Sequence, residues 1–173
     1  MVKLDSLLEQ IETTAVNMEF LRKRLPSDVL VTAYAKLKGK HRSDLFRGKR
    51  AVVVLIPKKN TKQGHFVVLL PRKHHIEYFS SLGGSPESEL AALNEPLTIF
   101  RNLLGKDFIY NRLKLQQGKY SIKSCAAWVL ARVYLSHLKL REFQEVFRRP
   151  ITLSDPDLIV STMVLLHFVN KSE

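Results

Sequence analysis

Two apolar runs, each closed by a proline, constrain the fold of this chain more than any other feature. Ala51 to Ile56 is rich in β-branched residues and ends at Pro57, and Gly64 to Leu70 is a second such run that ends at Pro71. Runs of this length and composition are typical of strands buried on both faces. The polar segment 58–63 between them predicts a loop. The sequence therefore predicts two neighbouring strands inside a sheet.

Two more segments predict further strands. His75 to Phe79 is short and aromatic, and it stops at the turn-forming segment 80–84, which contains two serines and two glycines. Asp107 to Leu115 carries apolar or aromatic residues and is followed by two glutamines, Gln116 and Gln117. We therefore expect a sheet of at least four strands.

Helical patterns flank these strands on both sides along the chain. Apolar residues at helical spacing predict a helix that begins near Leu4 and ends near the basic residues before Pro26. A second helix is predicted over 29–37. A third begins after Ser85 and is split or kinked at Pro96.

The C-terminal part of the chain predicts two more helices. Residues 125–137 are apolar nearly all round and follow Ser124, a candidate N-cap, so this helix is expected to be buried. The 154–157 segment predicts the start of a last helix that runs through Phe168. The pattern as a whole indicates the α+β class, with a mixed central β-sheet flanked by helices, in a single domain over 1–173.

The net charge of +12 points to a polyanionic partner, with nucleic acid as the first candidate. Much of the charge lies in one short segment that contains a single acid, Asp44. A solvated basic face is the alternative interpretation. The candidate nucleic-acid-binding residues are Lys36, Lys38, Lys40, Arg42, Arg47, Lys49 and Arg50.

Membrane insertion and secretion are not expected, because no apolar run reaches about 20 residues and no signal-peptide pattern precedes the first helix. The chain has one cysteine, Cys125, so no internal disulfide can form and a reducing compartment is expected. Cys125 is therefore inert packing, a metal ligand without cysteine partners, or a nucleophile.

Three residue types could form a cysteine-based catalytic site. Cys125 is expected in the first turn of a buried helix, where backbone N–H groups and the helix dipole stabilise a thiolate. His65 stands at the start of an apolar strand and is a candidate general base, or a structural histidine. Gln117 or Gln116 could donate to an oxyanion together with the Cys125 N–H, or either could be solvated. Gln117 is preferred here because it keeps the spacing to the cysteine shorter.

Four segments in this order resemble the adenovirus protease family, with relatives in polinton or Maverick elements and virophages, and more distantly the SUMO-specific proteases. Residues 64–67 resemble the segment that carries the family histidine, and 78–83 the segment that carries its acid. Residues 110–117 resemble the strand that ends in the oxyanion glutamine. Residues 121–128 resemble the nucleophile segment. The resemblance covers about 45–135, which would be the catalytic core, with N-terminal helices over 1–40 and C-terminal helices over 136–173.

The sequence departs from the family pattern at two positions. Ser80 stands where the family has the acid that orients the histidine, and serine carries no charge. Glu77 could replace this acid only in another register, because strand alternation places it on the face opposite Ser80. Ala126 stands where the family has a glycine after the nucleophile.

The resemblance implies a viral cysteine endopeptidase that cleaves capsid and core precursors, near small residues such as glycine, during virion maturation. It implies the adenain/Ulp1-like fold, with the nucleophile at the N-terminus of a buried central helix. We expect a monomer without metal or cofactor, located in the virion and in the host cytoplasm or nucleus, with non-specific DNA contact and with DNA as a candidate activator. Activation through a disulfide-linked peptide is excluded, since there is no second cysteine.

Two other functions stay open. One is a protease of the same fold that removes ubiquitin-like proteins from their conjugates. The other is a catalytically weakened relative that binds nucleic acid, which Ser80 and Ala126 suggest.

Overall fold

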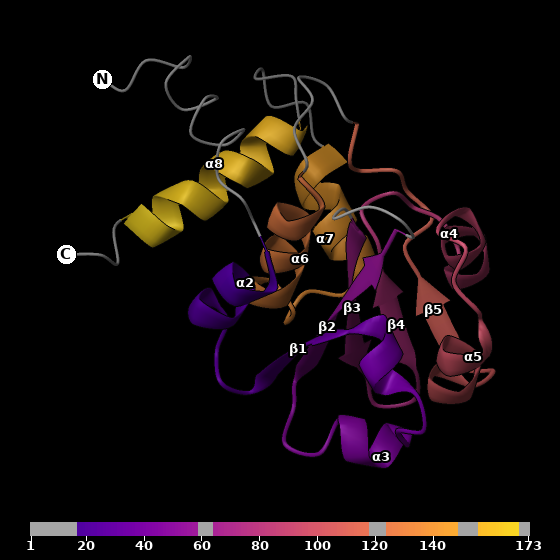
Figure 1. The fold of residues 1–173 in the computed structure, drawn as a ribbon. Helices are drawn as coiled ribbons and strands as arrows, with labels where there is room; N and C mark the ends of the chain where they lie inside the picture. The colour runs from indigo at the N-terminus through magenta and orange to yellow at the C-terminus, as the bar shows by residue number, and fades with distance from the viewer. Residues whose placement is uncertain (1–16, 59–63, 118–123, 149–155, 170–173) are drawn as a thin grey trace, which may run out of the picture.

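A computed structural model describes residues 17–58, 64–117, 124–148 and 156–169, and these form a five-stranded mixed sheet with helices (Figure 1). The strands follow their order in the chain across the sheet. The central strand β3 is antiparallel to both of its neighbours, and each edge strand is parallel to its neighbour. Their bounds are β1 (Val29–Ala33), β2 (Ala51–Pro57), β3 (Gly64–Pro71), β4 (Ile76–Phe79) and β5 (Phe108–Tyr110). This confirms the predicted α+β class.

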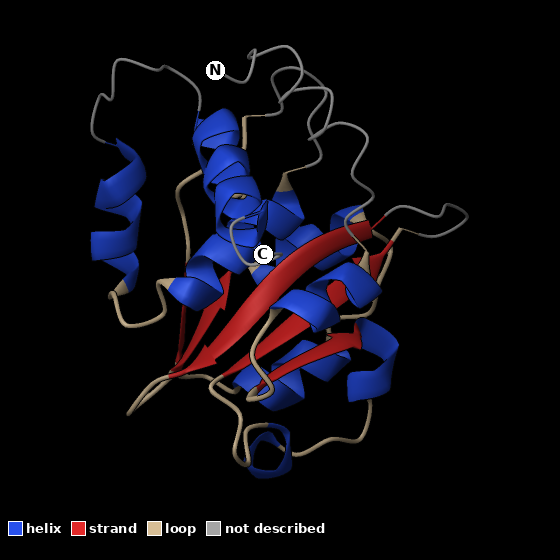
Figure 2. Cartoon of the chain, turned by 90° about the vertical axis from the view of Figure 1, so that its left-hand side faces the viewer, coloured by secondary structure: helices blue, strands red, loops and turns tan. Residues whose placement is uncertain are grey.

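Helices cover both faces of the twisted sheet (Figure 2). One face packs against α2 (Met18–Arg24), α6 (Cys125–Tyr134), α7 (Leu140–Arg148) and α8 (Pro156–Val169). The other face packs against the 3-10 helix η1 (Tyr34–Leu37) and against α3 (Arg42–Leu45), α4 (Pro86–Ala92) and α5 (Thr98–Leu104). None of the helices in the described part of the chain is both long and apolar enough to cross a membrane.

Strand β3 divides its side chains between two hydrophobic cores. Phe66, Val68 and Leu70 face the core on the α6 side, whereas Val67 and Leu69 face the core on the α4 side. Both cores are closed, so a strand at this position is apolar on both faces. This explains the continuous apolar runs and confirms the prediction that β2 and β3 are buried neighbours.

The first turn of α6 lies toward the end of the sheet at which β3 begins. Arg132 in the C-terminal half of α6 bonds to Glu77 of β4, with Nε 2.7 Å from Oε1. Glu77 pairs with Leu70 near the C-terminal end of β3. Cys125 precedes Arg132 by about 10 Å of helix. Since α6 packs along β3, its N-terminus extends toward the strand end that carries His65.

One predicted helix is wrong. Residues 29–37 form β1 followed by η1, so the predicted N-terminal helices over 1–40 contain an edge strand of the sheet. Val29 and Val31 are buried and alternate with Leu30, the pattern of a strand. The parallel strand β2 provides hydrogen-bond partners for the backbone N–H and C=O groups of this segment, which in an isolated helix would bond to one another.

Several other boundaries differ from the predictions. Helix α2 begins at Met18, because Asn17 is extended and its side chain caps the Phe20 N–H; the predicted start of the first helix near Leu4 lies outside the described residues. Strand β5 covers only 108–110 of the predicted 107–115. Helix α6 ends at Tyr134 rather than at residue 137. Helix α7 was not predicted individually, although it falls in the predicted C-terminal helical part.

Candidate active site

His65 is a buried base at the start of β3. Its side chain pairs with the Ser80 hydroxyl, with Nε2 2.8 Å from Oγ, and only 7% of the residue is exposed. Burial lowers the pKa of the imidazole to about 4, because water no longer solvates the charged form. The imidazole is therefore neutral near pH 7, the state in which a histidine can accept a proton.

Ser80 directly follows β4 and is held by two neighbouring segments. Its Oγ accepts a hydrogen bond from the Leu82 N–H at 3.2 Å, and its carbonyl oxygen accepts one from Asn111 Nδ2 at 2.6 Å. Asn111 is fully buried and follows β5. Two predicted site residues, His65 and Ser80, are thus brought into direct contact.

Glu89 is a buried acid in this site that sequence reasoning missed. Its Oε2 accepts a hydrogen bond from Tyr78 Oη at 2.5 Å and lies 3.8 Å from His65 Nε2. Its Oε1 accepts the Gly84 N–H at 3.2 Å. Burial raises the pKa of Glu89, while hydrogen bonds from the Ser80 and Tyr78 hydroxyls and from the Gly84 N–H oppose that rise. The site therefore contains a carboxyl group, but on a helix rather than on β4.

Two sequence signals could have revealed Glu89. Ser85 caps α4 and Pro86 begins it, as predicted, which fixes Glu89 in the first turn of the helix. The two glycines before the cap bring that turn close to the end of β4. A Cβ atom on Gly84 would lie 2.7 Å from Glu89 Cγ, so any larger residue here would displace the Glu89 side chain. The double glycine thus marks a close contact rather than only a strand end.

Glu77, the other acid considered from sequence, serves a different purpose. Its carboxylate pairs with Arg132 Nε at 2.7 Å and with Arg72 Nη2 at 2.8 Å. Both Glu77 and Arg132 are buried, and this ion pair joins β4 to α6. The structure agrees with the alternation argument that placed Glu77 away from Ser80.

Cys125 is the first residue of α6 and is partly buried, as the sequence predicts for a nucleophile at a helix start. Ser124 is the N-cap residue of this helix, as predicted, but its side chain makes no cap hydrogen bond. Its hydroxyl instead donates to Asp157 Oδ1 at 2.7 Å. The Ser124 side chain therefore makes no hydrogen bond to the backbone N–H groups in the first turn of α6.

Asp157 ties three parts of the site together. Besides Ser124, its carboxylate accepts the Gln117 backbone N–H at 2.8 Å and Trp128 Nε1–H at 2.7 Å. Asp157 is fully buried in the first turn of α8. Through it, α8 holds both ends of the segment that leads from the glutamines to Cys125.

The two candidate oxyanion residues differ in how their side chains are held. The Gln116 side chain is partly buried, and its Oε1 accepts a hydrogen bond from Ser81 Oγ at 2.8 Å. The backbone N–H groups of Leu115 and Gln116 both donate to the Ser81 carbonyl at 2.9 Å. The Gln117 side chain is exposed, and its described contact is through the backbone.

A series of hydrogen bonds and peptide links connects Ser124, the residue before Cys125, to His65. Ser124 bonds to Asp157, Asp157 to Gln117, and the adjacent Gln116 to Ser81. Ser81 follows Ser80, which bonds to His65. Gln116, Ser80 and His65 therefore lie in one network with Ser124, the residue before Cys125.

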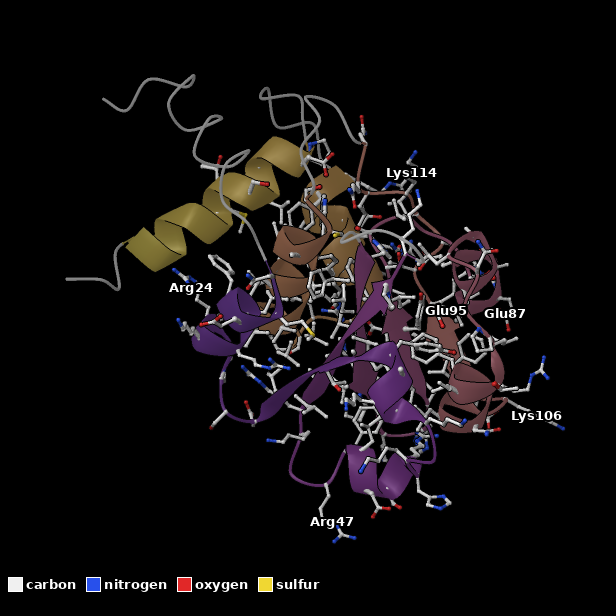
Figure 3. The ribbon with its side chains drawn as sticks, in the orientation of Figure 1. Arg24, Arg47, Glu87, Glu95, Lys106 and Lys114 are labelled. Atoms are coloured by element: carbon white, nitrogen blue, oxygen red, sulfur yellow. The ribbon has the colours of Figure 1, made fainter. Side chains whose placement is uncertain are left out.

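The basic segment lies at the opposite end of the sheet. Residue 51 begins β2 next to this segment, whereas Ile56 at the other end of the strand pairs with His65. The backbone of Lys114 lies close to the turn after Ser80, because a Cβ atom on Gly83 of that turn would be 2.7 Å from the Lys114 nitrogen. Figure 3 shows that Arg47 of the basic segment lies far from Lys114. All seven predicted nucleic-acid-binding residues are exposed except Lys49, which is partly exposed and whose Nζ donates to the Ser27 carbonyl at 2.7 Å.

Two of these basic residues pair with acids, Arg47 with Asp44 at 3.2 Å and Arg50 with Asp28 at 3.2 Å. Both pairs are at the surface, where such contacts are weak. No cluster of three or more His, Cys, Asp or Glu residues able to hold a metal ion occurs among the described residues.

Comparison with known proteins gives distant relations. No protein-family model matches the sequence. The chain is 26% identical over 150 residues to the uncharacterized protein V9 of the Sputnik virophage, which covers 80% of this chain and 86% of that protein. Neither this relation nor the structural similarity that follows is close enough to assign the chain to a family.

Two solved structures of Ulp1 are similar over most of the chain. The X-ray structure of the C-terminal Ulp1 protease domain in complex with Smt3, the yeast ortholog of SUMO, gives a TM-score of 0.38 at 18% identity and covers 93% of this chain and 77% of that chain. The SUMO protease Ulp1 with its catalytic cysteine oxidized to a sulfinic acid gives a TM-score of 0.35 at 16% identity, over 93% and 78% of the two chains.

Proposed function

We propose that this chain is a cysteine endopeptidase in which Cys125 is the nucleophile and His65 the general base. The observation that supports the proposal is the network of hydrogen bonds and peptide links between the buried, neutral His65 and Ser124, which precedes Cys125 at the start of α6. The resemblance of four sequence segments to the adenovirus protease family supports the same assignment.

The reaction follows from these roles. The Cys125 thiol transfers its proton to His65, and the sulfur attacks a peptide carbonyl carbon to form a tetrahedral oxyanion. Collapse of this intermediate breaks the C–N bond, and the His65 imidazolium protonates the leaving amine. Water, deprotonated by His65, then hydrolyses the thioester and regenerates the thiol.

Gln116 is the oxyanion donor that the contacts favour over Gln117. Its side-chain oxygen is held by Ser81, so its NH₂ group is turned away from Ser81 and is available to an oxyanion. Its partner would be the backbone N–H of Cys125, in the electropositive first turn of α6. The exposed side chain of Gln117 has no described partner to orient it.

For the substrate we propose precursors of viral capsid and core proteins, cleaved near small residues during particle maturation. The resemblance to the viral proteases supports this choice, and it would place the protein in the virion and in the host cytoplasm or nucleus. The second candidate substrate is a ubiquitin-like protein conjugate, which the distant resemblance to SUMO-specific proteases favours.

We also propose a non-specific contact with DNA through the exposed basic segment 36–50. The segment carries most of its charges in solvent, at the end of the sheet away from His65. A protein bound to DNA through this surface would leave the catalytic site accessible to a substrate, and DNA could then raise activity by concentrating enzyme and substrate on the same polymer.

The proposal is tested first without a substrate. The rate of Cys125 alkylation is measured by intact mass from pH 5 to 10 in the wild type, in His65→Ala and in the control His74→Ala, which changes an exposed histidine. Because the chain has one cysteine, modification reports one residue. We expect a midpoint well below the free-thiol value of about 8.5, raised in His65→Ala and unchanged in the control.

Ordinary, slow alkylation in the wild type that is insensitive to His65 would refute the Cys–His pair. Co-expression then separates the substrates. Cleavage of a capsid precursor that is lost in Cys125→Ala favours the viral role, whereas selective processing of a ubiquitin-like precursor favours the second candidate. The weakened, nucleic-acid-binding alternative predicts neither cleavage nor an activated thiol.

A further inference from the structure

The Ser80 hydroxyl stands between His65 and Glu89, and its hydrogen bonds determine which nitrogen of His65 carries the proton. A hydroxyl group has one proton and two acceptor lone pairs. The Leu82 N–H can only donate, so it takes one of the lone pairs of Ser80 Oγ. The remaining lone pair and the proton face His65 Nε2, at 2.8 Å, and the Glu89 carboxylate, whose Oε2 lies 3.8 Å from the same Nε2.

Glu89 can only accept at this place when it is ionised. Its two oxygens already receive hydrogen bonds from Tyr78 Oη and from the Gly84 N–H, both of which are donors. An ionised carboxylate therefore takes the proton of Ser80 as well. This leaves Ser80 Oγ as an acceptor toward His65, whose Nε2 must then carry the hydrogen.

We propose that Glu89 is a positioning residue that acts through the Ser80 hydroxyl to hold His65 in the Nε2–H tautomer. Nδ1 then presents a lone pair, which is what a base needs to accept the Cys125 proton. The inference rests on the proposed Cys125–His65 pair for its catalytic meaning. The buried acid that the sequence lacks at position 80 is thereby supplied from α4, with the serine as the link.

Glu89 also provides the charge that Ser80 cannot. Its Oε2 lies 3.8 Å from His65 Nε2, and only 6% of the residue is exposed. When His65 becomes an imidazolium during the reaction, a carboxylate at this distance stabilises the new positive charge in a site where water screens it little. The other nearby acid on α4, Glu87, is exposed and points away from the fold (Figure 3).

Protonation of Glu89 would allow His65 to leave the Nε2–H tautomer. A neutral carboxyl group can donate to Ser80 Oγ, and the Ser80 proton can then turn toward His65 Nε2, which leaves the hydrogen on Nδ1. The titratable groups that face Glu89 are His65 of β3 and Tyr78 of β4, with Tyr34 and Glu87 close enough to act on Tyr78. The tautomer of His65 is therefore expected to change at acidic pH in the wild type.

The test is ¹⁵N NMR of the His65 imidazole in the full chain, in the wild type, Glu89→Gln and the matched control Glu87→Gln. The wild type and the control should show a protonated Nε2 and an unprotonated Nδ1 near pH 7. Glu89→Gln keeps the size of the side chain but can present either an acceptor or a donor to Ser80, so we expect a mixture of tautomers or a protonated Nδ1. Cys125 alkylation at pH 7 should slow at least about tenfold.

Ser80→Ala is the second variant, because it removes the link while leaving the Tyr78–Glu89 bond in place, and it decides the matter if Glu89→Gln does not fold. It should change the tautomer as Glu89→Gln does. A His65 that stays in the Nε2–H form in both variants would overturn the inference, even if the wild-type thiol is activated. An unactivated wild-type thiol would instead refute the proposed function, and the tautomer measurement would still test the role of Glu89.

Discussion

His65, the proposed general base, is also a buried residue that affects the stability of the protein. The unfolded chain takes up a proton on this histidine near pH 6.5, whereas in the native protein burial lowers the pKa to about 4. Since the unfolded state binds the proton more tightly, the native state loses stability as the pH falls through this range. Above pH 6.5 the imidazole is neutral in both states and carries no such cost.

We therefore predict that the free energy of unfolding decreases as the pH falls from 6.5 toward 4, by up to about 3 kcal/mol from His65 alone. Urea unfolding at several pH values in the wild type and in His65→Gln measures it. The difference in pH dependence between the two proteins isolates the contribution of His65, because the carboxyl groups titrate in both. Equal pH dependence in the two proteins would contradict burial of a neutral imidazole.

The two glutamines give a second prediction at the residue scale. Gln116→Ala should reduce hydrolysis of an activated ester such as p-nitrophenyl acetate by about 10² to 10³, the usual effect of losing one oxyanion donor. Gln117→Ala should change it only slightly, since its side chain is exposed. Neither should alter Cys125 alkylation, which forms no oxyanion. A larger loss of ester hydrolysis in Gln117→Ala than in Gln116→Ala would identify Gln117 as the oxyanion donor, as the sequence spacing suggested.

Helix α8 acts on the site as an element, through a single residue. Asp157 accepts hydrogen bonds from the loop at Gln117, from Ser124 and from the Trp128 indole. Because all three donors are held by one buried carboxylate, the docking of α8 and the position of the nucleophile segment are coupled. The hydrogen bond that Ser124 makes to α8, in place of a cap on α6, is a consequence of this arrangement.

Asp157→Asn should therefore destabilise the protein by about 1 to 3 kcal/mol, because the new amide N–H₂ faces groups that also donate. It should also slow Cys125 alkylation at temperatures where the variant is still folded. Thermal unfolding and alkylation by intact mass measure the two effects. Met163→Ala, which changes an exposed residue of the same helix, is the control and should have little effect on either. Unchanged alkylation would show that Asp157 is only structural.

At the scale of the whole molecule, the sheet separates the proposed active site from the basic segment. Strand β2 begins next to Arg50 and pairs with His65 near its other end. Seven residues of strand span about 20 Å, so direct contacts do not connect the two regions. We expect substitutions in one region to leave the other unaffected.

Double-stranded DNA should bind the protein with an affinity that falls steeply with salt concentration. Replacing Lys38 and Arg42 by glutamine should weaken binding and reduce the slope of log affinity against log salt by about one for each phosphate that the variant no longer neutralises. Fluorescence anisotropy with a labelled duplex at several salt concentrations measures this, and the Cys125 alkylation rate should be unchanged. Weak binding without salt dependence would remove DNA from the proposed partners.

Local sequence pattern was sufficient to predict the central features of this protein. β2 and β3 could be predicted without tertiary information, because a strand that is buried on both faces is apolar at nearly every position. The placement of Cys125 at the start of a buried helix and of His65 at a strand end followed from local pattern in the same way. Strand alternation likewise separated Glu77 from Ser80 correctly.

Contacts between distant segments account for the features that local pattern did not predict. Residues 29–33 are a strand because β2 lies beside them, and their three β-branched residues already favoured that structure. The Ser124 side chain bonds to Asp157, which lies 33 residues away in the sequence, rather than to the backbone at the start of α6. Glu89 becomes part of the site because α4 folds back onto the end of β4. Local propensities are weak compared with burial and hydrogen bonding between distant segments, and those long-range contacts exist only in the folded chain.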